Sequence, residues 1–126
     1  MPLTVEHASI RNLDRLCEIE QECFKTEAFT KKHLALLLED YNCVSLVAKE
    51  NSEIVGFVIG ALRLIGNTLT GHIFTIDVSV KYRGKGIGLK LLREIEKIFK
   101  EKGAKTSMLE VREDNIQALK LYQKAG

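Results

Sequence analysis

The sequence predicts an α/β (α+β) fold with a mixed, mostly antiparallel sheet that is flanked by helices. Apolar residues recur with helical spacing in some segments, and in others they alternate or form short runs typical of strands. These segments follow one another in the order β-α-α-β-β-β-α-β-α. Three consecutive strands favour an antiparallel meander, and the strand–loop–helix–strand unit from His72 to Val111 favours a right-handed parallel crossover.

The N-terminal part is expected to contain a short strand and two helices. Leu3 and Val5 alternate with polar residues, which indicates a strand. Asn12 can cap a helix that extends to about Cys23, and Thr30 can cap a second helix. A solvated surface is expected for the acidic side chains of the first helix, Glu18, Glu20 and Glu22.

Three strands follow and are joined by turns. The segments Val44–Lys49 and Ile54–Leu64 are rich in β-branched and apolar residues, and the polar segment Glu50–Glu53 between them indicates a hairpin turn. Gly66–Gly71 is expected to form the next turn, and His72–Val80 the third strand.

The C-terminal part alternates helix and strand. A glycine-rich loop, Arg83–Gly88, leads into a strongly amphipathic helix that extends to Glu101 and has Gly103 as its C-cap. Met108–Val111 is expected to be a short buried strand. Asn115 can cap a final helix that continues to the end of the sequence.

Length and composition fit one globular domain covering residues 1–126. Hydrophobic residues make up 45% and charged residues 29%, and the net charge of +2 gives no general indication of a nucleic-acid or membrane partner. The longest nearly apolar run, Ile54–Leu62, is short of the ~20 residues of a membrane helix. The 3 cysteines argue against a disulfide framework, and we expect a cytoplasmic protein that is a monomer or a weak dimer.

The segment from Asp77 to Gly88 carries the strongest functional signal. It places a strand, closely spaced glycines and a helix N-terminus in direct succession. Glycines allow a ligand to approach the backbone, and the N–H groups of the first helical turn favour an anion, best a phosphate. The alternative is a turn softened by glycine and surrounded by solvated lysines. Positive charge around the loop comes from Lys81, Arg83, Lys85 and Lys90.

Two common phosphate-binding patterns are excluded. Gly66 and Gly71 have the spacing of a P-loop, but His72 stands where that loop needs lysine. The first two glycines of the later loop match the dinucleotide fingerprint, but Leu89 replaces its third glycine.

Two other motifs point to one family. Arg83, Gly86 and Gly88 match R-x-x-G-x-G, and with the preceding V-x-V this segment resembles motif A of the GNAT superfamily of acetyl-CoA-dependent N-acetyltransferases. The string Leu109–Gly126 resembles L-E-V-R-x-x-N-x-x-A-x-x-L-Y-x-x-x-G, which is typical of the branch that acetylates protein N-termini, the RimI-like and archaeal enzymes. The resemblance covers essentially the whole chain and implies a GNAT-like sheet.

The resemblance implies a site for acetyl-CoA and no metal. The backbone of Arg83–Gly88 would hold the pyrophosphate, the backbone around Val78 and Val80 would pair with the pantetheine arm, and Asn115 would bond near that arm. The cofactor-binding residues implied in this way are Val78, Val80, Arg83, Gly84, Lys85, Gly86, Ile87, Gly88 and Asn115.

The same resemblance implies the catalytic residues. Glu110 would deprotonate the amine, directly or through water, and Tyr122 would protonate the departing thiolate. At neutral pH an α-amine, with a pKa of ~7.7–8.0, is roughly 10–20% free base, whereas lysine is below about 0.1%. A modest carboxylate base can therefore serve an N-terminus. No covalent enzyme intermediate is expected.

The resemblance also implies that the loop between the first two helices, Phe24–Phe29, lines the acceptor site. Phe24 and Phe29 could form an apolar wall for the first residue of a peptide, and Glu27 could attract its ammonium group. Each candidate also has a structural reading: a solvated strand carboxylate for Glu110, core packing for Tyr122, and loop anchors for the two aromatics. A structural role is expected for His72, and no metal-ligand spacing is found at His7 or His33.

The function that these motifs imply is acetyl transfer from acetyl-CoA to the N-terminal α-amine of a protein, by direct attack in a ternary complex. Transfer to a lysine side chain or a small amine such as a polyamine remains open, as does a non-catalytic CoA-binding module. No direct contact with nucleic acid or membrane is expected. Compared with the family pattern, the final C-terminal strands after Gly126 are expected to be absent from the chain.

Overall fold

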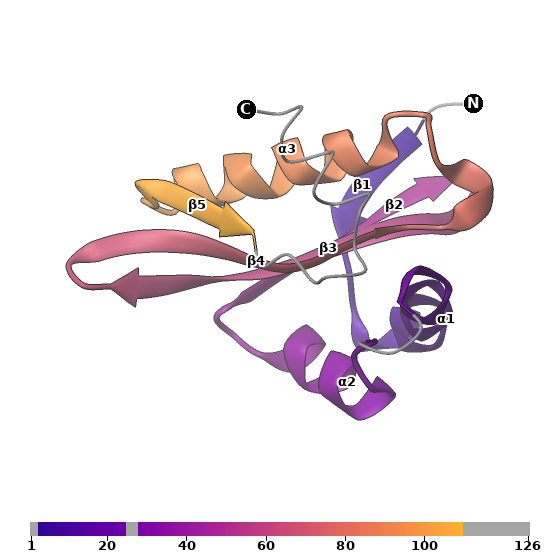
Figure 1. The fold of residues 1–126 in the computed structure, drawn as a ribbon, viewed down its shortest axis with the longest axis horizontal. Helices are drawn as coiled ribbons and strands as arrows, with labels where there is room; N and C mark the ends of the chain where they lie inside the picture. The colour runs from indigo at the N-terminus through magenta and orange to yellow at the C-terminus, as the bar shows by residue number, and fades with distance from the viewer. Residues whose placement is uncertain (1–2, 25–27, 110–126) are drawn as a thin grey trace.

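The computed structural model describes residues 3–24 and 28–109 (Figure 1). The final helix expected after Asn115 lies outside these residues. The described elements are β1 (Leu3–His7), η1 (Ile10–Asn12), α1 (Leu13–Cys23), α2 (Lys31–Glu39), β2 (Cys43–Glu50), β3 (Glu53–Ile65), β4 (Thr68–Val78), η2 (Val80–Tyr82), α3 (Ile87–Glu101) and β5 (Thr106–Leu109).

The strands form one mixed sheet in the order β1-β2-β3-β4-β5. Neighbours from β1 to β4 are antiparallel, and β5 pairs in parallel with β4 after the α3 connection. The predicted meander and the predicted parallel pairing are both confirmed, and so is the fold class. The Asn51-Ser52 turn also forms as expected, with φ of +54° and +68°.

Helices cover both faces of the sheet (Figure 1). α3 lies on one face, where Leu91, Ile95 and Phe99 are buried against strands β2 to β4. α1 and α2 lie on the other face, where Leu16 and Leu34 pack with buried side chains of β2 and β3. Each such side chain contributes about 1.5–3 kcal/mol when it is fully buried.

The turn between β3 and β4 is shorter than Gly66–Gly71, the expected range. Ile65 pairs with Thr68, so the loop contains only Gly66, with φ of +63°, and its neighbour. Gly71 lies inside β4. The strand has glycine at this position because a Cβ there would come within 2.1 Å of the Phe99 ring. Its lack of a side chain serves helix packing, and composition alone cannot distinguish that use from a turn.

In the part of the chain that the structure describes, no helix is long and apolar enough to span a membrane.

Candidate active site

The loop between β4 and α3 begins at the C-terminal end of β4. β4 stops at Val78, η2 follows, and α3 starts at Ile87. Gly84 and Gly86 have φ of +79° and +80°, in the left-handed region that other residues rarely adopt. A Cβ added at either glycine would meet nothing within 4 Å. The backbone conformation therefore requires these glycines, and the space beside them is open to a ligand.

The N-terminus of α3 makes this loop suitable for an anion. The first N–H groups of a helix have no acceptor within the helix, and the helix dipole concentrates positive charge there. The N-cap residue, Gly86, has no side chain that could accept hydrogen bonds from these N–H groups. Lys81 and Lys85 are exposed beside the loop, and the Lys85 ammonium lies 5.3 Å from the centre of the Tyr82 ring. The residues present fit a phosphate or pyrophosphate group.

Arg83 differs from these lysines because its side chain is partly buried and bonded within the protein. Its Nε donates to the Val78 carbonyl oxygen at 3.2 Å, and its Nη2 donates to the Cys23 sulfur at 3.2 Å. The guanidinium group thereby connects the loop to β4 and to α1. Lys90, also expected near the anion, pairs with Glu94 at 3.6 Å.

The backbone at Val78 and Val80 is not one continuous strand. Val78 ends β4, whereas Val80 begins η2 and is 55% exposed. The Val80 N–H donates to Glu22 Oε1 at 3.1 Å, and the Ser79 hydroxyl donates to the same oxygen at 3.2 Å. The expected strand extension to Val80 is wrong because a side chain of α1 takes the hydrogen bond that a strand would use.

A buried polar cluster joins α1, β4 and Phe29. Glu20 is 0% exposed and Asp77 is 1% exposed. The Thr75 hydroxyl lies 3.3 Å from Glu20 Oε1 and 2.6 Å from Asp77 Oδ1, and the Phe29 N–H donates to Glu20 Oε2 at 2.9 Å. The expectation of a solvated surface is therefore wrong for Glu20. Its position four residues after Leu16, on the buried side of α1, is the sequence signal that could have revealed it.

The residues expected to bind the acceptor have different environments. Phe24 is 1% exposed, which fits the loop-anchor reading. Phe29 is only partly buried, and its ring centre lies 4.7 Å from that of His33. Phe29 is therefore the better placed of the two aromatics to contact a substrate. Glu27 lies outside the described residues.

The Cys23 thiol is a poor nucleophile. Burial, together with the nearby Asp77 carboxylate, raises its pKa from 9.0 to about 11, although the hydrogen bond from Arg83 opposes the shift. The thiol therefore stays protonated at neutral pH, and only the thiolate is reactive. Burial and the charge of Asp40 raise the pKa of Cys43 to about 11 as well.

The described end of β5 lies beside the middle of β4. Leu109 pairs with Ile73, and Met108 pairs with His72. His72 is buried, and its Nδ1 lies 3.0 Å from Arg63 Nη1. Outside the described residues lie the expected catalytic pair and one expected cofactor contact, Glu110, Tyr122 and Asn115.

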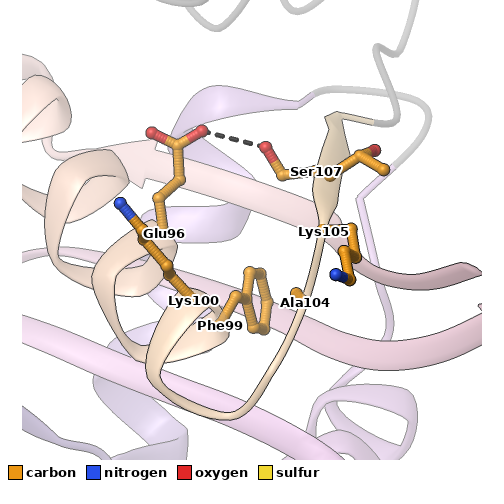
Figure 2. A pocket seen from close by; sticks show the side chains of 7 residues that line it. Glu96, Phe99, Lys100, Ala104, Lys105 and Ser107 are labelled. Carbon is orange, nitrogen blue, oxygen red and sulfur yellow. Dashed lines mark hydrogen bonds between the residues drawn. The ribbon is translucent and has the colours of Figure 1, made fainter.

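A separate groove of about 200 Å³ lies between α3 and β5 (Figure 2). Phe99 contributes an apolar side chain to it, and the Ser107 hydroxyl donates to Glu96 Oε2 at 3.0 Å. Glu96 is nine residues beyond the start of α3, roughly 14 Å along the helix axis. The groove is therefore distinct from the glycine loop. Within residues 3–24 and 28–109, no three His, Cys, Asp or Glu side chains are grouped as a metal site would require.

A mixed sheet whose fourth strand leads through a glycine loop into the N-terminus of a helix is suited to phosphate-bearing ligands. The profile of the acetyltransferase (GNAT) family matches residues 13–126. The chain belongs to this family, whose enzymes transfer an acetyl group from acetyl-CoA.

Sequence relatives cover nearly the whole chain. An uncharacterized N-acetyltransferase of Methanocaldococcus jannaschii is 34% identical over 125 residues, which is 98% of this chain and 77% of that protein. N-alpha-acetyltransferase 30 of Schizosaccharomyces pombe is 29% identical over 125 residues, covering 98% of this chain and 83% of that one.

Solved structures show the same fold. The PaiA N-acetyltransferase of Thermoplasma acidophilum, in complex with coenzyme A, has a TM-score of 0.82 and 25% identity, with 100% of this chain and 89% of that one covered. A ribosomal-protein-alanine N-acetyltransferase of Brucella melitensis has a TM-score of 0.83 and 20% identity, over 99% and 91%. An aminoglycoside acetyltransferase from an uncultured soil metagenomic sample has a TM-score of 0.79 and 22% identity, over 97% and 86%.

Proposed function

We propose that this acetyltransferase acts on the N-terminal α-amine of a protein. The proposal depends chiefly on the similarity to a relative named N-alpha-acetyltransferase, which extends over 98% of the chain. An N-alpha-acetyltransferase of Sulfurisphaera tokodaii adds support, with 28% identity over 97% of this chain and 78% of its own length.

The cofactor side of the proposed site is the loop from Arg83 to Gly88. Its left-handed glycines and the α3 N-terminus would hold the pyrophosphate, while Arg83 fixes the loop through its own side chain. Val78, Val80 and Asn115 are proposed to contact the pantetheine arm. Acetyl-CoA supplies the acetyl group as a thioester, which an amine can attack without a metal.

The proton transfers are assigned to two side chains. Glu110 would take a proton from the α-ammonium group, because only the free amine attacks the thioester carbon. Tyr122 would donate a proton to the CoA sulfur as the C–S bond breaks. Transfer from a phenol with a pKa of ~10 to a thiolate whose conjugate thiol has a pKa of ~8.5 is unfavourable by only about 1.5 pKa units, a small cost for a general acid. As the amide forms, the nitrogen loses its second proton, which would restore the Tyr122 phenol through solvent. The amine thus gains the acetyl group and CoA leaves as the free thiol.

The acceptor side favours a peptide over a polycation. A polyamine site would be expected to expose several carboxylates. Two carboxylates of the polar cluster near Phe29, Glu20 and Asp77, are buried and are not available to a polycation. Phe29, which is partly buried, offers apolar surface to a first side chain. Glu27 is proposed to attract the ammonium group.

A peptide panel tests the choice of acceptor. We expect CoA thiol release with peptides whose N-terminus is free, and none with the same peptides acetylated at the N-terminus but containing lysine. Spermidine and an aminoglycoside serve as small-amine controls. Equal rates with blocked and free peptides, or a preference for the small amines, would contradict the proposal.

Two substitutions test the catalytic assignments. Tyr122→Phe should lower kcat about 100-fold or more, the usual contribution of a general acid, while acetyl-CoA binding by calorimetry stays near wild type. Glu110→Gln should lower the plateau of the pH–rate profile and shift the profile to higher pH. Wild-type behaviour of both variants would remove these two roles.

A further inference from the structure

The last turns of α1 carry two carboxylates whose hydrogen bonds lead to different parts of the proposed site. Glu20 accepts from the Phe29 N–H at 2.9 Å, and the Thr75 hydroxyl lies 3.3 Å from its other oxygen. Because Glu20 is 0% exposed, its hydrogen bonds do not compete with water. Glu20 thereby connects Phe29, the last residue of the expected acceptor loop, to Thr75 in β4.

Glu22 makes the corresponding connection on the cofactor side. One of its carboxylate oxygens accepts from the Val80 N–H at 3.1 Å and from the Ser79 hydroxyl at 3.2 Å. Ser79 is buried and immediately follows the end of β4. Glu22 therefore holds the chain at the point where it leaves the sheet and enters the glycine loop.

The geometry of a helix explains how one element reaches both sides. Two residues along an α-helix are roughly 200° apart around its axis, so Glu20 and Glu22 point in nearly opposite directions. Arg83 reinforces the second connection, since it donates to the sulfur of Cys23, the last residue of α1. A displacement of α1 would move both Phe29 and Val80.

We propose that Glu20 and Glu22 are positioning residues for the two substrates: Glu20 places Phe29 for the amine acceptor, and Glu22 places the β4 end for acetyl-CoA. This inference rests on the proposed function, since it takes Phe29 as part of the acceptor side and the β4 end as part of the cofactor side. Neither carboxylate exchanges a proton with substrate. The two residues act by holding backbone groups.

Kinetics with both substrates varied should separate the two roles. Glu20→Ala is expected to raise the KM of the acceptor about fivefold or more and to leave the KM of acetyl-CoA within twofold, because it loses hydrogen bonds on one side only. Glu22→Ala should show the reverse. The matched control is Asp14→Ala, because Asp14 is exposed on the same helix and pairs with Lys31 at 2.6 Å, whereas the partner of Glu18, Arg15, also lies 4.0 Å from Glu22.

Conservative variants provide a rescue. In Glu20→Gln the amide oxygen can still accept from the Phe29 N–H, and its NH₂ group can donate to the Thr75 oxygen. In Glu22→Gln the oxygen can accept both bonds. Both variants should therefore restore KM to within about twofold of wild type. A twofold change in KM corresponds to less free energy than the loss of one hydrogen bond.

Partner substitutions keep the test decisive if an alanine variant does not fold. Ser79→Ala should affect only the KM of acetyl-CoA. Thr75→Val removes the bond to Glu20 and also the 2.6 Å bond to Asp77 near the end of β4, so it should raise the acceptor KM more than that of acetyl-CoA. If either set of variants shifts both KM values equally, or neither, the positioning roles are wrong. The assay uses whichever amine the wild-type enzyme accepts best, so a wrong acceptor class would appear in the wild-type panel and a wrong positioning role in the variants.

Discussion

Gly86 has a left-handed backbone conformation and lies in the loop that is proposed to bind acetyl-CoA. Its φ of +80° would strain any other residue, and no atom lies within 4 Å of a Cβ built there. We expect Gly86→Val to cost about 1–3 kcal/mol in local strain or to change the loop conformation. Either outcome should weaken acetyl-CoA binding at least tenfold by calorimetry, while the core stays folded.

A matched control exists in the β3–β4 turn. Gly66 has φ of +63° and also has nothing within 4 Å of a built Cβ. Gly66→Val should therefore lower the melting temperature by a similar amount and leave acetyl-CoA affinity unchanged. Equal loss of affinity in both variants would show that Gly86 acts only through stability.

The Cys23 thiol should lose its proton only at high pH in the folded protein. Its pKa of about 11 predicts that alkylation by iodoacetamide, followed by peptide mass spectrometry, has its midpoint near pH 11, against about 9 in urea. Because the folded pKa lies above the unfolded value of 9.0, this thiol stabilises the fold below pH 9, and that stabilisation is lost as the pH rises through 11. A folded-state midpoint below pH 9 would contradict this environment.

Single residues also show how far sequence reasoning extends. Glu18, Glu20 and Glu22 have equal charge and similar neighbours in the sequence, so composition assigns them one solvated surface. The fold separates them: Glu18 is exposed, whereas Glu20 is buried because β4 and Phe29 supply hydrogen-bond donors. The spacing from Leu16 indicates the buried side of the helix, but the donor Thr75 lies 55 residues further along the chain, where no local pattern identifies it. The assignments of Glu110, Asn115 and Tyr122 stay predictions.

At the scale of elements, α3 and the sheet are in very close contact. A Cβ at Gly71 would lie 2.1 Å from Phe99 Cδ2, and one at Gly60 would lie 2.9 Å from Phe99 Cζ. Gly71→Ala should therefore destabilise the protein by about 1–3 kcal/mol, as overpacked cores do. Urea unfolding measures this cost.

The double variant tests whether Phe99 is the cause. Phe99→Leu alone should also destabilise, but it removes the ring that a Cβ at Gly71 would meet. The two costs should then sum to more than that of the double variant by at least about 0.5 kcal/mol, the usual sign of direct contact. Strict additivity would mean that Gly71 is needed for another reason.

Elements with strong periodicity were predictable, whereas element ends were less so. The amphipathic stripe of α3 and the β-branched runs of β2 and β3 are local signals, and the structure confirms these elements. The β3–β4 turn and the end of β4 depend on distant partners: Phe99 requires a glycine inside a strand, and Glu22 ends the sheet pairing before Val80.

At the scale of the whole molecule, positive charge is concentrated in the segment that contains the glycine loop and α3. Residues 81–105, which include the glycine loop and α3, contain 9 Lys and Arg against 3 Asp and Glu. The rest of the chain contains 10 Lys and Arg against 14 Asp and Glu. The small net charge of +2 is therefore the sum of a basic segment with a charge of +6 and a remainder with a charge of −4. Such a separation attracts an anionic substrate to one side of the protein.

Salt should reveal this separation in the kinetics. The Debye length falls from about 10 Å at 0.1 M to about 3 Å at 1 M, so exposed lysines lose most of their long-range attraction. We expect the KM of acetyl-CoA to rise about fivefold over this range and that of an uncharged-side-chain peptide to change less than twofold. Lys85→Gln should flatten the dependence on salt, because Lys85 is exposed beside the loop. Lys105→Gln should not, because exposed Lys105 lies beyond the opposite end of α3, which is roughly 20 Å long. A parallel rise of both KM values would indicate a general effect of salt on the enzyme instead of a basic cofactor side.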